Sequence, residues 1–461
     1  SGHRALDVAG ARVDTRASNG KTGNWLLDPT DIQIISGPYG GIFIGGYGTP
    51  FDPLANSVIT DGDVNNSLGL TNLTIQTKTG TGGNGNITAT GVNINNFAGG
   101  GSTSLSLLAY GGDAATGNIT ISGSQFNLQD GALTLVAGWD GNAGTNLAAD
   151  DGTNGSLTIT DSMLSGGAIG MKAVADISAI GVTTGTWIQS SGTMDVQANN
   201  INLTGGGGTI SSSQGPGVVL KSMGAQTITA GNQILLQAGS ADNTTFSGSP
   251  QYGGSVGISS DASQIVSGKF IRIRAGAGGH DNSAEIQAYG GQTISVTGGG
   301  QLEITGGGSA GSYNNQARVL HGRWTGPGTY EGVGNQTINI NGGGSVEIAG
   351  GSGDGTLGYY DQDCVTAGNS VATCSGSSNS AQIESVFGDQ TLNFVSGGGL
   401  TITGGSVGSN NWAGIENEAE QAGNTQSITG DPDITLTGGS SGGKAIGAPD
   451  DDFDLTNDAG I

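Results

Sequence analysis

Apolar and polar residues alternate along most of this chain, in short runs separated by glycine. The clearest example begins at Gln292, where QTISVTGGGQLEITGGG contains two alternating stretches joined by three glycines. Alternation with period two is typical of a β-strand with one buried face, and glycine clusters mark turns. Close copies of this phrase begin at Gln336 and Gln390. More divergent copies begin at Gln226, Gln264 and Gln426.

A third short run follows each pair of stretches, after a loop of variable length. The step between the leading glutamines varies from 28 to 54 residues, while the runs and the glycine turn keep their lengths. A solenoid tolerates insertions at its corners, because each coil contacts only its neighbours. We therefore predict an all-β fold, a single-stranded parallel β-helix with variable corner loops. The third runs begin at Ala284, Ala317, Ala381, Ala413 and Ala445.

The rest of the sequence is a looser version of the same pattern. Residues 1–220 carry short alternating runs with longer insertions, residues 221–447 carry the regular repeats, and residues 448–461 form an acidic tail. Only residues 171–182 give any sign of a helix, and their Ile, Val and Gly content favours a strand as much. In the run QTINI, Ile338 and Ile340 should share the face that points to the core.

Composition limits the classes of partner. The chain has 461 residues, of which 93 are Gly, and only 11% are charged. A Gly- and Ser-rich chain can be disordered, but here the glycines punctuate strand-like runs. The formal charge is −24, with 13 Lys and Arg against 37 Asp and Glu. This balance argues against nucleic acid and anionic lipid surfaces as partners. Since no apolar run reaches the roughly 18 residues of a membrane span, we expect no membrane insertion.

Two cysteines, Cys364 and Cys374, lie in one loop of the repeat region. Two thiols alone do not make a structural zinc site. A disulfide that closes the loop is favoured over two free thiols, and it implies an oxidising compartment. The coils on either side do not depend on this bond.

Some β-helices cleave polysaccharides, and they need carboxylates gathered on one face together with a base or a metal. Here the carboxylates are scattered. Glu303 and Glu347 occupy the same place in successive copies, so they should stack as an outward ladder on a solvated face, where two glutamates without a cation would repel each other. DGDVNN from Asp61 and DGNAGTN from Asp140 suggest calcium loops but lack the terminal Glu. The three histidines have no metal-ligand spacing. We predict no catalytic residues, no metal site and no cofactor.

Several aromatic residues lie in the predicted loops. They can pack on the flank of the solenoid, or they can form a contact surface for sugars or for another subunit. The candidates for such a surface are Trp324, Tyr330, Tyr359, Tyr360 and Trp412.

The phrase NWLLDPTDI, at residues 24–32, is the most specific in the chain. It resembles a segment of filamentous-haemagglutinin-like exoproteins of the two-partner secretion type. Residues 71–88, TNLTIQTKTGTGGNGNIT, and the run GNITISGSQFNLQDGALTLVAG from Gly117 are similar to that family as well. The resemblance covers about residues 6–138 and implies a right-handed parallel β-helix that is exported and serves adhesion or surface structure. The family's secretion domain with its Asn-Pro motifs is not matched here, so we expect a mature piece of a longer precursor.

The residues of this segment also have a purely structural reading. Trp25 to Leu27 form an apolar run that Pro29 stops, because proline cannot donate to a strand ladder. On that reading the segment is a corner with Trp25 in the core.

We therefore expect a secreted structural or adhesive protein of the cell surface, either a filament subunit or an adhesin shaft, without enzymatic activity. The alternatives are a carbohydrate-active β-helix enzyme and a carbohydrate-binding module. Neither end of the sequence shows a capping helix or a bulky polar loop, so the ends should be open strand edges. Open edges predict head-to-tail self-association into filaments, or else cut faces of a longer rod. Carbohydrates and cell-surface receptors are further candidate partners.

Overall fold

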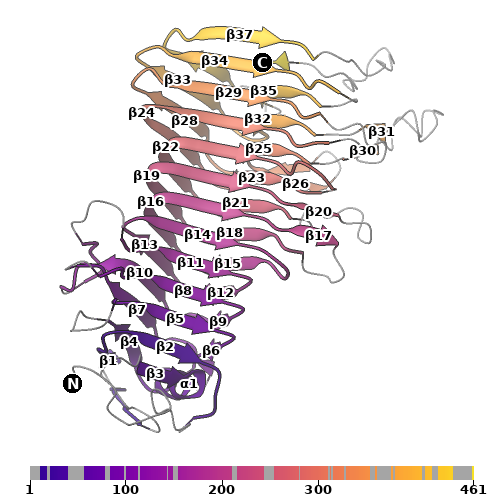
Figure 1. The fold of residues 1–461 in the computed structure, drawn as a ribbon. Coiled ribbons are helices and arrows are strands. Elements are labelled where there is room, and N and C mark those ends of the chain that lie inside the picture. The colour runs from indigo at the N-terminus through magenta and orange to yellow at the C-terminus, as the bar shows by residue number, and fades with distance from the viewer. Residues whose placement is uncertain are drawn as a thin grey trace. The chain divides into compact units, whose positions relative to one another are not determined.

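The fold was analysed in a computed structural model of the chain. The structure describes residues 11–17, 21–39, 57–77, 84–97, 100–112, 115–142, 144–148, 154–209, 215–242, 254–279, 281–309, 312, 315–326, 329–352, 359–360, 375–376, 379–407, 411–417, 424–439 and 459–461. It divides into two compact units, and each is a parallel β-helix (Figure 1). The predicted fold class is confirmed.

The first unit comprises residues 1–179, 186–201 and 221–229. Each coil has three strand positions, and each strand pairs in parallel with the strand at the same position of the next coil, as Leu73 does with Leu105. The first position holds β1 (Asn24–Leu27), β4 (Asn72–Gln76), β7 (Leu105–Tyr110), β10 (Leu133–Trp139) and β13 (Ile169–Ala173). The second holds β3 (Ser57–Thr60), β2 (Ile32–Ile35), β5 (Ile87–Thr90), β8 (Ile119–Ser122), β11 (Leu157–Thr160) and β14 (Asp176–Ile180), and the third holds β6 (Asn93–Asn95), β9 (Gln125–Asn127), β12 (Met163–Gly166) and β15 (Thr186–Ser190).

The second unit comprises residues 180–185, 202–220 and 230–461. Here β22 (Gln264–Arg274) and β24 (Gln292–Thr305) each fill the first and second positions without a break. The first position continues with β28 (Gln336–Asn341), β33 (Gln390–Val395) and β36 (Gln426–Thr429), and the second with β29 (Ser345–Ala349), β34 (Gly399–Thr403) and β37 (Asp433–Thr437). The third position holds β21 (Val256–Ser260), β23 (Ala284–Ala288), β25 (Ala317–His321), β32 (Ala381–Ser385), β35 (Ala413–Asn417) and β38 (Ala459–Gly460).

Some strands belong to both units, and others come from the corner insertions. The strands β16 (Met194–Thr204), β18 (Val218–Ser222) and β19 (Gln226–Gln237) contribute residues to both units, as does β14 through Ile180. Three small pairs come from the corner insertions. They are the parallel pair β17 (Gly207–Thr209) and β20 (Ser240–Asp242), and the antiparallel pairs β26 (Arg323–Gly326) with β27 (Thr329–Glu331) and β30 (Tyr359–Tyr360) with β31 (Ser375–Gly376).

The predicted repeat sets the register of the second unit. The glutamines that begin successive copies lie directly opposite one another, from Gln264 through to Gln426. The predicted third runs stack in the same way from Ala284 to Ala413. The residue opposite Ala413 is Ala459, and the predicted run at Ala445 lies outside the described residues. Ile338 and Ile340 are fully buried, as the alternation predicts.

The long insertions fall at different corners in the two units. In the first unit, an insertion between Trp139 and Leu157 separates a first strand from a second strand, and another lies between β2 and β3. In the second unit the largest separates the second and third strands, between Ala349 and Ala381. The stretch with a hint of helix at residues 171–182 is strand, in β13 and β14.

A column of buried glutamines runs through the second unit. The Nε2 of Gln292 donates to Oε1 of Gln264 at 2.9 Å, and Gln336 donates to Gln292 at 2.8 Å. Gln390 and Gln426 continue the column at 2.9 and 2.8 Å. The same Nε2 groups reach carbonyls of the third strands, as Gln390 does with Glu416 at 2.9 Å. Buried polar groups need such partners, and here the glutamines of neighbouring coils and the third strands supply them.

A second column lies just before the third strands. The backbone N–H of Asn282 donates to Oδ1 of Asn315 at 2.8 Å, and Asn315 donates in the same way to Asn379 at 3.0 Å. Asn379 repeats the contact with Asn411 at 3.0 Å, and all four side chains are buried. Each asparagine therefore joins its corner to the corner of the next coil.

A short helix, α1 (Asp61–Leu68), covers the free edge of β6 in the first unit. Asn65 accepts from the N–H of Asn95 at 2.7 Å and donates to the carbonyl of Asn93 at 2.8 Å. Asp61 accepts from the N–H of Asn93 at 2.9 Å. The expectation of uncapped ends is wrong at this edge, because helix side chains take the ladder bonds that another strand would otherwise make.

The segment DGDVNN, which suggests a calcium loop, forms the start of this helix. The Oγ1 of Thr60 accepts from the N–H of Asp63 at 3.1 Å, which is an N-cap contact. A threonine followed three residues later by an acid is a helix-start signal that the sequence did offer.

The WLLDP segment forms the first corner of the unit. The strand β1 ends at Leu27, before Asp28 and Pro29, as predicted. The core residue is Leu27, whereas Trp25 is only partly buried and Leu26 is half exposed. Trp25 has the same parity as Leu27, but it lies near the start of β1, where its side chain is only partly covered. The expectation of a core tryptophan is therefore wrong.

Candidate functional site

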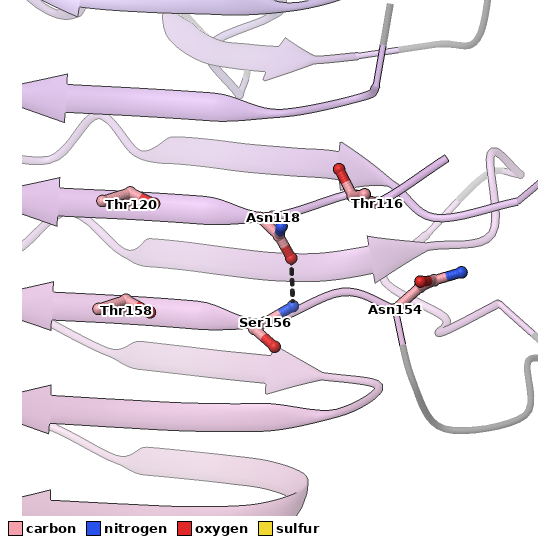
Figure 2. Close-up of a pocket in the computed structure, with 6 residues that line it drawn as sticks. All are labelled: Thr116, Asn118, Thr120, Asn154, Ser156 and Thr158. Atoms are coloured by element: carbon pink, nitrogen blue, oxygen red, sulfur yellow. Dashed lines mark hydrogen bonds between the residues drawn. The ribbon is translucent and has the colours of Figure 1, made fainter. Parts of the chain in front are cut away.

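A polar groove of about 220 Å³ lies on the outer face of the first unit, over β8 and β11 (Figure 2). Threonine, serine and asparagine are the only residue types in its wall, so the groove carries no charge. One wall comes from β8 and the residues before it, and the other from the equivalent residues of β11. The lining residues are Thr116, Asn118, Thr120, Asn154, Ser156 and Thr158.

Bonds between coils hold the two walls in register. The Oδ1 of Asn118 accepts from the N–H of Ser156 at 2.8 Å (Figure 2). One coil earlier, Oδ1 of Asn86 accepts from the N–H of Asn118 at 2.9 Å and from Oγ1 of Thr116 at 2.7 Å. The column begins at Asp31, whose Oδ1 accepts from the N–H of Asn86 at 2.7 Å. The groove is therefore preformed by the stacking of the coils.

Beside this column, outward hydroxyls form a regular array. Thr120 lies opposite Thr88 on one neighbouring strand and Thr158 on the other. Two residues further along, Thr90, Ser122 and Thr160 form a second row. The structure gives none of these six side-chain hydroxyls a hydrogen bond to the described part of the chain, so all can bind an external partner. The inward residues between the two rows, such as Ile121 and Ile159, are fully buried and hold the array in place.

The predicted contact aromatics are spread over several insertions. Trp324 and Tyr330 lie opposite each other in the pair of β26 and β27, and Tyr359 and Tyr360 form β30. Trp412 is partly buried at the corner before β35, where its carbonyl accepts from the N–H of Ala381 at 3.0 Å. The predicted disulfide, Cys364 with Cys374, lies outside the described residues.

The predicted glutamate pair does stack, since Glu303 lies opposite Glu347. Two arginines lie beside Glu303. Arg274 Nε lies 2.6 Å from Glu303 Oε1, and Arg272 Nε lies 3.3 Å from Glu303 Oε2. The hydrogen bond that Arg274 donates to Glu303 raises the pKa of Arg274 above its ordinary value. This pairing could not be predicted from the sequence, because the arginines belong to the preceding coil.

The described residues contain no group of three or more acidic, histidine or cysteine side chains that could hold a metal ion. His321, the histidine that the structure describes, lies at the end of β25 and is fully buried. Its Nδ1 is 3.1 Å from Oγ of Ser385, which occupies the same place in the next coil. His321 is thus a structural residue of the coil interior.

Burial lowers the pKa of His321 below its ordinary value of 6.5. In the unfolded chain the imidazole binds a proton more readily, so stability is full above about pH 6.5 and falls as the pH drops below it. We expect the urea midpoint to decrease between pH 7.5 and pH 5. In His321→Ser, which places the residue of the next coil at this position, that decrease should be smaller. An equal decrease in both proteins would contradict the assignment.

The groove was missed from the sequence, although a signal was present. NITAT at residues 86–90 and NITIS at 118–122 repeat the same polar positions on equivalent strands. That repeat predicts stacked outward Asn and Thr once the coils are aligned. The hollow itself also depends on residues 154–156, which come from a long corner insertion.

The chain was compared with models of protein families, with curated proteins and with solved structures, and none of these matched it. The resemblance of residues 24–32 to filamentous-haemagglutinin-like exoproteins stays a prediction. Within the described residues, no helix is both long and apolar enough to span a membrane.

Proposed function

We propose that this protein is a secreted structural or adhesive protein of the cell surface, an adhesin shaft or a filament subunit. The observation that carries the proposal is the column of glutamines from Gln264 to Gln426, of which the first four are buried. Its side chains bond coil to coil, so the second unit resists separation of its coils. Such internal polar bonding suits a load-carrying rod, and a solenoid extends it by adding repeats.

The pattern of charges supports a function without catalysis. On the faces of the second unit, the carboxylates of Glu285 and Glu303 are paired with arginines, at 2.8 and 2.6 Å. The groove of the first unit has no acid or base in its wall. Hydrolysis of a glycosidic bond needs two carboxyl groups flanking the bond. The groove favours carbohydrate binding over carbohydrate cleavage as the second candidate function.

Self-association is part of the proposal. In β37, Ile434 and Leu436 are 48% and 49% exposed, although their counterparts Leu400 and Ile402 in β34 are buried. In the described part of the chain, β37 exposes an apolar face that β34 buries in the coil interior. A second copy of the chain that docks here would form a heterologous contact, which grows into a filament when it does not close.

Electron microscopy and sedimentation of the purified chain test this proposal. We expect fibres of constant width whose formation increases with protein concentration. Leu436→Lys should reduce fibre formation, because the charge would be buried in the contact. Thr435→Lys, on the opposite face of the same strand, is the matched control and should assemble as the unaltered chain does. If only monomers were found at high concentration, the filament subunit would be ruled out and the adhesin shaft would stand as the proposed function.

A further inference from the structure

We propose that the groove and the hydroxyl array on β5, β8 and β11 bind an extended neutral polysaccharide, with one sugar unit contacted by each coil. This inference rests on the proposed adhesive function and names its ligand class. Three features of the surface carry it: its chemistry, its spacing and its rigidity.

The chemistry favours a neutral, hydroxyl-rich ligand. Each threonine or serine hydroxyl can both donate and accept a hydrogen bond, and each asparagine amide offers a donor and an acceptor side by side. Sugar hydroxyls have the same double capacity. The groove lacks a charged side chain, and the chain as a whole carries a formal charge of −24. An anionic polysaccharide would therefore find no counter-charge in the groove and a repulsive field around it.

The spacing favours a polymer that crosses the strands. Thr88, Thr120 and Thr158 lie directly opposite one another, so the same hydroxyl recurs at each strand spacing of about 4.8 Å. A sugar unit in an extended chain has nearly the same length as this spacing. A polysaccharide lying along the stacking direction would thus meet an equivalent threonine at every unit.

Rigidity favours binding by many weak contacts. The column of Asn86, Asn118 and Ser156 is held by backbone-to-side-chain bonds of 2.8 and 2.9 Å. Little side-chain or loop freedom remains to be lost when a ligand binds. None of the six groove residues is aromatic, so sugars are held by hydrogen bonds without ring stacking. Each sugar contact is then weak, and useful affinity requires several units in register.

Affinity electrophoresis of the full chain tests the ligand class. Gels would contain dextran, yeast mannan, galactomannan or hydroxyethyl cellulose as neutral probes, and alginate or hyaluronan as anionic probes. We expect at least one neutral polysaccharide to retard the chain, with little dependence on salt. With oligosaccharides cut from that polymer, affinity should rise up to about three or four units and then level off, since three coils carry the array.

Variants locate the site. Thr120→Val with Thr158→Val keeps the shape of the array and removes two central hydroxyls, so binding should weaken about tenfold or more. The matched control is Thr134→Val. Thr134 lies on the outer face of β10, which precedes β11 in the same coil and does not line the groove, so this variant should bind as the unaltered chain does. Circular dichroism would confirm that both variants fold.

Three outcomes would overturn the inference. They are no retardation by any neutral probe, retardation by the anionic probes alone, and equal binding by the double variant and the unaltered chain. None of them bears on fibre formation, which tests the structural part of the proposed function separately.

Discussion

Replacing Ile338 with Asp is expected to unfold the coil that contains it. Ile338 is fully buried and stacks between Ile294 and Leu392 of the neighbouring coils. A carboxylate at this position would have no cation or N–H within the apolar interior. Burial of an unpaired charge should lower the free energy of unfolding by more than about 4 kcal/mol. Urea denaturation followed by circular dichroism would show the loss.

Asn339→Asp is the matched control for this substitution. Asn339 lies on the outer face of the same strand, and its Oδ1 accepts from Asn393 at 3.4 Å. Aspartate keeps that acceptor in a solvated position, so the change should stay within about 0.5 kcal/mol. Similar losses in the two variants would mean that the alternation of faces in β28 is assigned wrongly.

Gln336→Leu should remove the central member of the buried glutamine column. The substitution deletes the donor to Gln292 at 2.8 Å and the acceptor for Gln390 at 2.9 Å. Leucine has a similar volume, so the cost comes from buried polar groups that lose a partner. We expect a loss of about 2 to 4 kcal/mol, since each unsatisfied group costs about 1 to 3 kcal/mol.

Gln301→Leu provides the comparison on the outer face. The Nε2 of Gln301 donates to Glu347 at 3.0 Å in an exposed position, so water can replace the bond. Its stability should change by less than about 0.5 kcal/mol. If Gln336→Leu were as stable as this control, the glutamine column would have no role in holding the coils together.

The repeat itself could be derived from the sequence. Apolar residues at every second position determine which face of each strand is buried, and this placed Ile338 and Ile340 correctly. Recurring phrases determine the register, because identical coils stack best when equivalent residues lie opposite each other. The three-glycine turn is also local, since Gly298 and Gly299 adopt positive φ values of 58° and 69°. Glycine adopts such angles with little strain, whereas other residues rarely do.

Other features depend on which coil lies beside which, and only the tertiary structure decided them. The leading glutamines have the parity of core residues, yet a polar side chain is stable there because glutamines of the neighbouring coils and carbonyls of the third strands supply its partners. Arg272 and Arg274 reach Glu303 across a strand pair, although about 30 residues separate them in the chain. The edge cap by α1 and the groove beside Asn118 likewise join segments that are distant in sequence. Alternation and turns are properties of neighbouring residues, whereas pairing of polar groups is a property of the stack.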